Sequence, residues 1–185
     1  MLNHEYLVMV APDYCKGADF ILHTDSDCIF TEPVRPEDYL VDGKPVLLVK
    51  EYGAKLAKEH PEVQPWKDAV ERAIGYCTHE TMQRHPAVHH PKTYEAACMV
   101  ILNHTGKSPS EYIRMQRNEF PQGFCEFNTL GNVALRNFKE DYHVIDLDKE
   151  PRPKDKIRQA WSHQPPTQND MEAYRKAGLF EGDKP

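Results

Sequence analysis

Two aspartates near the amino-terminal end of the sequence are the residues best suited to chemistry. Asp25 and Asp27 follow directly on the apolar segment 18–23, which has the character of a strand. In an extended chain the side chains alternate between two faces, so both carboxylates point the same way and Ser26 points the other. Two neighbouring negative charges are stable only if one is protonated or a cation lies between them. A hard divalent ion such as Mg²⁺ or Mn²⁺, held together with a substrate phosphate, is the usual occupant.

A purely structural role accounts for the same triplet, because aspartate is also common in the turn that follows a strand. The surrounding residues favour the metal. The segment Ile-Leu-His-Thr-Asp-Ser-Asp-Cys-Ile-Phe at 21–30 resembles the Asp-x-Asp strand end of GT-A glycosyltransferases, whose acids hold a divalent cation against the diphosphate of a nucleotide-sugar. The resemblance implies that Asp25, Ser26 and Asp27 contact a metal-bound donor, a UDP-sugar, with Mn²⁺ or Mg²⁺ as the cofactor.

The segment 82–91 is a second candidate. Its Met-Gln-Arg-His-Pro run is similar to a loop that lines the acceptor cleft in the glycosyltransferases that this chain most resembles, which implies acceptor contacts for Arg84 and His85. The prolines predict an extended loop, and a solvated loop would account for the same residues. A zinc site also stays open, although the spacing of its candidate ligands matches no standard zinc pattern. Those ligands are Cys77, His79, His85, His89 and His90.

Glu126 and Asn128 lie at the start of a helix predicted over residues 125–138. An acid in the first turn of a helix complements the helix dipole, so a structural role for Glu126 is open. The segment Glu-Phe-Asn-Thr-Leu-Gly is also similar to the GT-A helix start that faces the acceptor. This resemblance implies that Glu126 is the general base and that Asn128 contacts the acceptor.

His163 follows the last predicted strand, at 157–163. Its place in the chain resembles that of the histidine that completes the metal shell or contacts the diphosphate in several GT-A enzymes. Imidazole is a reasonable ligand for Mn²⁺ and a poorer one for Mg²⁺. The sequence holds ten histidines, so the order of the segments carries this assignment.

The elements that must position these residues alternate between helix and strand without repeats, which predicts one α/β domain over residues 1–185. Strands are predicted at 18–23, 45–49, 142–147 and 157–163, and helices within 4–17, at 65–76, at 92–103, from Ser108 onward, at 125–138 and at 170–179. The resemblance implies a GT-A-like mixed sheet flanked by helices and shortened at its amino-terminal end. GT-A proteins carry roughly a hundred residues of nucleoside-binding βαβ structure before the acid pair. Three interpretations stay open: a minimal version of the fold, a fragment of a longer chain, and a protein whose missing half comes from a partner or a second copy.

Composition limits the class of protein. The mean composition, 39% hydrophobic and 28% charged, is that of a globular domain, and the net charge of −6 disfavours a sequence-blind grip on nucleic acid. No apolar run reaches the length of a membrane span, and the amino terminus lacks the features of a signal peptide. Five cysteines without a Cys-x-x-Cys pair are typical of a reducing compartment. We therefore expect a cytoplasmic protein.

These features predict an enzyme, a metal-dependent glycosyltransferase of the hexosyltransferase type. It would transfer sugar from a nucleotide-sugar to a hydroxyl acceptor, for which a glycan, a lipid, a protein and a modified nucleobase all stay open. A nucleotidyltransferase or phosphotransferase would use the same acid pair but needs a Gly-rich phosphate loop, which the sequence lacks. The third possibility is a catalytically inactive or partial GT-A-like binding module, which needs a partner for the nucleotide site.

Overall fold

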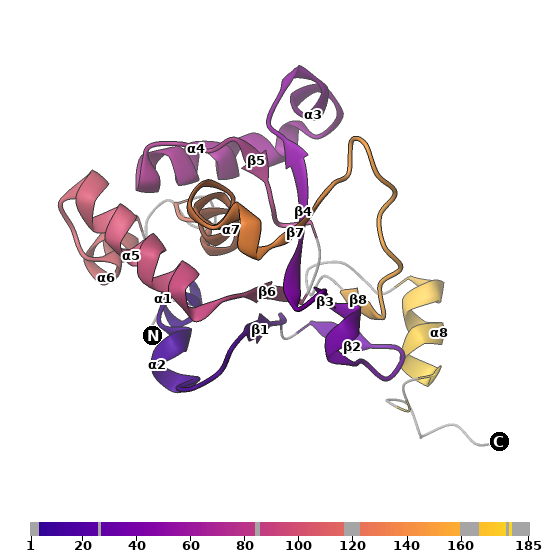
Figure 1. Cartoon of the computed structure of the whole chain (residues 1–185). Helices are drawn as coiled ribbons and strands as arrows, with labels where there is room; N and C mark the ends of the chain where they lie inside the picture. Colours follow the sequence, from indigo (N-terminus) through magenta and orange to yellow (C-terminus); the bar gives the residue numbers. More distant parts are fainter. Residues whose placement is uncertain are drawn as a thin grey trace.

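The computed structural model describes residues 4–25, 27–83, 86–116, 123–159, 167–176 and 178. Within these ranges the chain is a mixed α/β structure of helices and small sheets (Figure 1). None of the helices in them is long and apolar enough to cross a membrane.

Each predicted helix and strand has a counterpart close to its predicted position, and five further helices and strands occur within the described ranges. The helices are α1 (His4–Met9), α2 (Ala11–Tyr14), α3 (Ala54–Glu59), α4 (Gln64–Ile74), α5 (Pro91–Thr105), α6 (Pro109–Met115), α7 (Glu126–Asn137) and α8 (Gln168–Lys176). The strands are β1 (Ile21–His23), β2 (Cys28–Phe30), β3 (Leu40–Val41), β4 (Lys44–Glu51), β5 (His79–Glu80), β6 (Ala87–His89), β7 (His143–Asp146) and β8 (Ile157–Gln159), and 3₁₀ turns occupy η1 (Pro36–Asp38), η2 (Pro61–Val63) and η4 (Lys139–Asp141). Helix α3 and the short strands β2, β3 and β5 had not been predicted, and β6 lies in a segment expected to be a loop.

Strand β4 organises the largest sheet. It pairs antiparallel with β3 and β5 and parallel with β7, where Leu47 lies opposite Val144. Strand β1 pairs antiparallel with β6, and β2 pairs antiparallel with β8. Within the described residues the strands therefore form three small sheets, whereas the sequence had suggested one mixed sheet.

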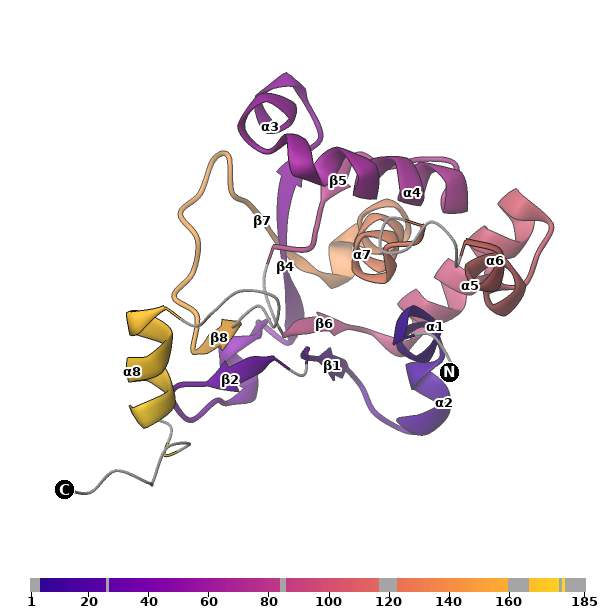
Figure 2. The same ribbon diagram turned by 180° about the vertical axis from the view of Figure 1, so that it is seen from behind.

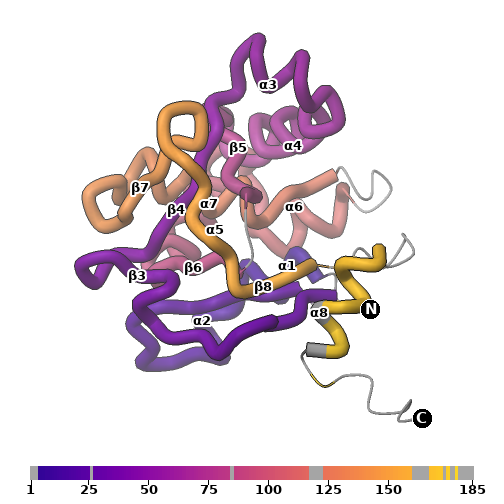
Figure 3. The backbone as a smooth tube through the Cα atoms, turned by 90° about the vertical axis from the view of Figure 1, so that its right-hand side faces the viewer, coloured from indigo at the N-terminus to yellow at the C-terminus, as the bar shows by residue number. Residues whose placement is uncertain are grey.

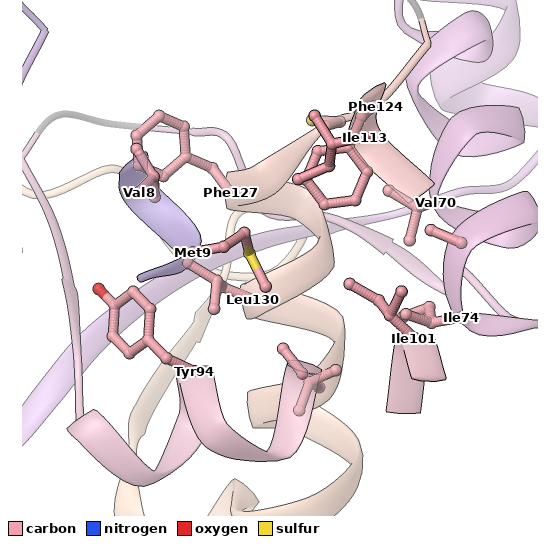
Figure 4. Close-up of a cluster of buried hydrophobic side chains, with 14 of the residues drawn as sticks. Val8, Met9, Val70, Ile74, Tyr94, Ile101, Ile113, Phe124, Phe127 and Leu130 are labelled. Carbon is pink, nitrogen blue, oxygen red and sulfur yellow. The ribbon is translucent and has the colours of Figure 1, made fainter. Parts of the chain in front are cut away.

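The core lies among the helices. Helices α4, α5, α6 and α7 gather at one end of the molecule, and β2, β8 and α8 lie at the other (Figures 1 and 2). Side chains from α1, α5 and α7, among them Met9, Tyr94 and Leu130, interdigitate between the helices (Figure 4). This packing holds the first turns of α1 and α7 together.

Helix α7 is buried from Glu126 to Ala134, and two asparagines one turn apart attach it to the segment 78–82. Asn132 Oδ1 accepts hydrogen bonds from the backbone N–H groups of Thr78 (2.9 Å) and His79 (3.2 Å). Asn128 Oδ1 accepts from the backbone N–H groups of Thr81 (2.7 Å) and Met82 (3.1 Å). The helix that begins with Glu126 therefore also fixes the backbone that leads to residue 83.

Candidate functional site

The two aspartates lie in the turn between β1 and β2. Strand β1 ends at His23, and the turn is closed by a hydrogen bond from the Cys28 N–H to the Asp25 carbonyl (3.1 Å). The turn, and not the alternation of an extended strand, therefore orients the carboxylates. They converge all the same: Gln159 Nε2 donates to Asp25 Oδ2 (3.1 Å) and to Asp27 Oδ1 (3.2 Å).

Gln159 reaches the acid pair because β8 pairs with β2 and places Gln159 opposite Cys28. Its amide N–H groups bring partial positive charge between two carboxylates that would otherwise repel each other. The sequence predicted a strand at this position but contained no signal for its partner, so this contact was not foreseen.

The donor atoms around the aspartates fit a hard divalent cation. They are carboxylate oxygens that share one hydrogen-bond donor, Gln159 Nε2. Mg²⁺ and Mn²⁺ prefer carboxylate ligands and complete their shells with water and phosphate oxygens. Within the described part of the chain there is no group of three or more His, Cys, Asp or Glu side chains placed to hold a metal. A cation here would therefore take Asp25 and Asp27 from the described residues and further ligands from elsewhere.

Glu126 is the first residue of α7, and its carboxylate pairs with His4 at the start of α1. The distance from His4 Nδ1 to Glu126 Oε1 is 3.3 Å, and the exposed fractions of the two side chains are 62% and 11%. The hydrogen bond to Glu126 raises the pKa of His4, and the negative charge of Asp25 raises it further. His4 therefore lies within electrostatic reach of both Asp25 and the predicted general base.

The sequence did not single out His4. Nothing in its neighbourhood distinguishes it from the other nine histidines, and only the packing of α1 against α7 brings it to Glu126.

The predicted acceptor residues are placed unequally. Arg84 and His85 lie outside the described residues. Hydrogen bonds from two other parts of the chain, Asn128 and Arg152, hold the backbone that precedes them. Arg152, from the long connection between β7 and β8 (Figure 3), donates to the carbonyl oxygen of Gln83 and to its Oε1 (3.0 Å). Asn128 has no exposed surface, because its carboxamide bonds to the backbone at Thr81 and Met82. Its contact with an acceptor stays a prediction, whereas its role in anchoring this segment is visible.

Ser26 and His163, which were predicted to contact the donor and the metal, also lie outside the described residues. The zinc alternative gains no support from the parts of its ligand set that are described. His89 is buried with Nδ1 3.2 Å from the Tyr142 hydroxyl, and His90 Nε2 lies 3.3 Å from the Asp141 carbonyl oxygen. In both His89 and His90, one ring nitrogen therefore already makes a hydrogen bond to another protein group.

Comparison of the chain with protein-family models, with curated proteins and with solved structures gives no match.

Proposed function

We propose that this protein is a metal-dependent glycosyltransferase with a GT-A-like domain, which transfers a hexose from a UDP-sugar to an acceptor hydroxyl. The observation that carries the proposal is the convergence of the Asp25 and Asp27 carboxylates on one amide, that of Gln159. Such a pair, in a turn at the carboxyl end of a strand, is suited to a cation that carries a diphosphate. The link from Asp25 through His4 to Glu126 supports a second, acceptor-binding part of the same site.

In this proposal the residues divide the work between donor and acceptor. Asp25 and Asp27 hold the cation, and Mn²⁺ or Mg²⁺ supplies Lewis acidity that offsets the charge on the departing diphosphate. Glu126 takes the proton of the acceptor hydroxyl as this oxygen forms its bond to the sugar. The buried position of Glu126 limits competition from water. His163 would contribute to the donor side, and Arg84 and His85 to the acceptor side.

A second candidate function is a GT-A-like binding module that acts without catalysis. Among the described strands β1 pairs only with β6, and Leu22 on β1 is 47% exposed. An open strand edge with an exposed apolar side chain is a site where another chain can add a strand. A partner that covers this edge is the occupant that this alternative requires.

The metal and donor are tested by thermal unfolding, because a ligand that binds only the folded state raises the midpoint. We expect Mn²⁺ together with one member of a panel of UDP-sugars to raise Tm by about 5–10 °C at a ligand concentration roughly 100 times Kd. Asp27→Asn should abolish this shift and leave the unliganded Tm within a few degrees, because it removes one carboxylate charge and little volume.

Asp42→Asn is the matched control. Asp42 lies in an exposed turn with a φ of 51°, a left-handed conformation that asparagine adopts readily, so this variant should keep the full shift. A shift that persists in Asp27→Asn would exclude Asp27 as a ligand. A wild-type protein that unfolds cooperatively and shifts with no donor would favour the binding module.

A further inference from the structure

The pair formed by His4 and Glu126 joins a buried carboxylate to an exposed imidazole. Glu126 is 8% exposed as a residue, and the contact to His4 Nδ1 is 3.3 Å. A proton that arrives on a buried carboxyl must leave before the next turnover. His4, whose side chain is 62% exposed, connects this carboxyl to water.

Three carboxyl groups face His4. Glu126 approaches from α7, Asp25 from the turn between β1 and β2, and Glu5 from α1 itself, and all three raise the pKa of His4 against the opposing effect of burial. Glu126 has the largest influence, through its hydrogen bond. The positive form of His4 is therefore stabilised mainly by an ionised Glu126, and it loses most of that support when Glu126 takes up a proton.

Glu5 is the third acid beside this pair. It is buried, its Oε2 has no hydrogen-bond partner, and both burial and the charge of Glu126 raise its pKa. The charge of His4 acts in the opposite direction and lowers the pKa of Glu5, so the two groups influence each other.

We propose that His4 is a positioning residue for Glu126 and the exit through which the proton of the acceptor reaches solvent, an inference that rests on the proposed function. As the acceptor oxygen bonds to the sugar carbon and the bond from that carbon to the diphosphate breaks, the hydroxyl proton moves to the Glu126 carboxylate. The exposed imidazolium of His4, no longer opposed by a negative charge, loses its Nε2 proton to water, and exchange with water then moves the remaining ring proton from Nδ1 to Nε2. The neutral ring takes the carboxyl proton at Nδ1 and restores the ion pair, so that one proton passes from acceptor to solvent.

The coupling itself is tested without any substrate, by following the histidine ring signals of ¹⁵N-labelled protein by NMR as pH is changed. His4→Gln identifies the His4 signal by its loss. We expect His4 to titrate above pH 6.5 in the wild type and at lower pH in Glu126→Gln, which removes the charge and keeps the shape. An unchanged His4 titration in Glu126→Gln would overturn the proposal.

The role of His4 in releasing the proton is tested by enzyme turnover. The substrate is the UDP-sugar that gives the Mn²⁺-dependent shift in Tm, and the release of UDP is measured between about pH 5.5 and 9. His4 carries its positive charge only below its pKa, which the hydrogen bond to Glu126 raises, so the loss of His4 must matter most at the lower pH values. We expect turnover by His4→Gln to be about tenfold below wild type near pH 6 and within about twofold of it near pH 8.5.

His60→Gln is the matched control, because His60 Nδ1 lies 3.0 Å from Glu62 Oε1 in a pair whose two partners are both exposed. Its pH profile should follow the wild type. An equal loss in His4→Gln at every pH would mark His4 as merely structural and overturn its role while the proposed function stands. A wild type that releases no UDP from any donor would overturn the proposed function, and the proton exit with it.

Discussion

Gly131→Ala is expected to lower the free energy of unfolding by about 3 kcal/mol or more. A Cβ at position 131 would lie 2.1 Å from Thr81 Oγ1 and 2.4 Å from Thr81 Cβ. Rotation of the threonine side chain moves its hydroxyl but not its Cβ, and the Thr81 N–H is held by Asn128 at 2.7 Å. The clash with Thr81 can therefore be relieved only if α7 separates from the segment 78–82. This separation breaks the hydrogen bonds that Asn128 and Asn132 make to that segment.

Equilibrium unfolding in denaturant, followed by circular dichroism, measures this loss. Gly53→Ala is the control, because no atom lies within 4 Å of its added Cβ and its φ of −128° suits alanine. We expect this control to stay within about 1 kcal/mol of the wild type. Equal midpoints for Gly131→Ala and the wild type would mean that α7 and Thr81 do not pack as described.

The second large effect is a loss of folding stability in acid. We expect His89 alone to reduce the free energy of unfolding by about 3 kcal/mol between pH 6.5 and pH 4. Burial lowers the pKa of His89 to about 3, and the neighbouring His23 and His90 lower it as well. His89 is 2% exposed, and Nδ1 lies 3.2 Å from the Tyr142 hydroxyl. A charged imidazolium there would lose its hydration without gaining an acid partner.

The direction of this pH effect follows from the pKa of His89 in the folded chain, about 3, and its ordinary value of 6.5 in the unfolded chain. Between about pH 3 and 6.5 the unfolded chain binds a proton at His89 and the folded chain does not, so stability rises with pH across this window and falls as acid is added. Well above pH 6.5 neither state binds a proton at His89, and the effect vanishes.

The measurement compares the pH dependence of unfolding in the wild type and in His89→Gln, which removes the titrating group and keeps a polar side chain. Other groups also titrate in this range, so the difference between the two proteins is the relevant quantity. His104→Gln, which changes an exposed histidine, should retain the wild-type dependence. If His89→Gln did so too, the description of His89 as a buried neutral ring would be wrong.

Local signals in the sequence were enough to predict several helices. Gly106 follows the end of α5, where it takes a φ of 70°, and α6 begins after Ser108, as predicted, with a capping box formed by Ser108 and Glu111. These signals act within one or two turns, so neighbouring residues suffice to predict them. The mixed α/β class followed in the same way, whereas the GT-A-like fold, the metal and the donor stay proposals.

Contacts between residues far apart in the chain depend on the tertiary structure. Residues 87–89 were expected to lie in a loop because of the prolines on either side, and they form strand β6 by pairing with β1, where Ile21 lies opposite His89. In the same way the pairing of β2 with β8 brings Gln159 to the two aspartates, and the packing of α1 on α7 brings His4 to Glu126. Residue type and spacing predicted the acids, but their partners lie more than a hundred positions away in the chain. Periodicity carries no information about such contacts, because they depend on how whole elements pack.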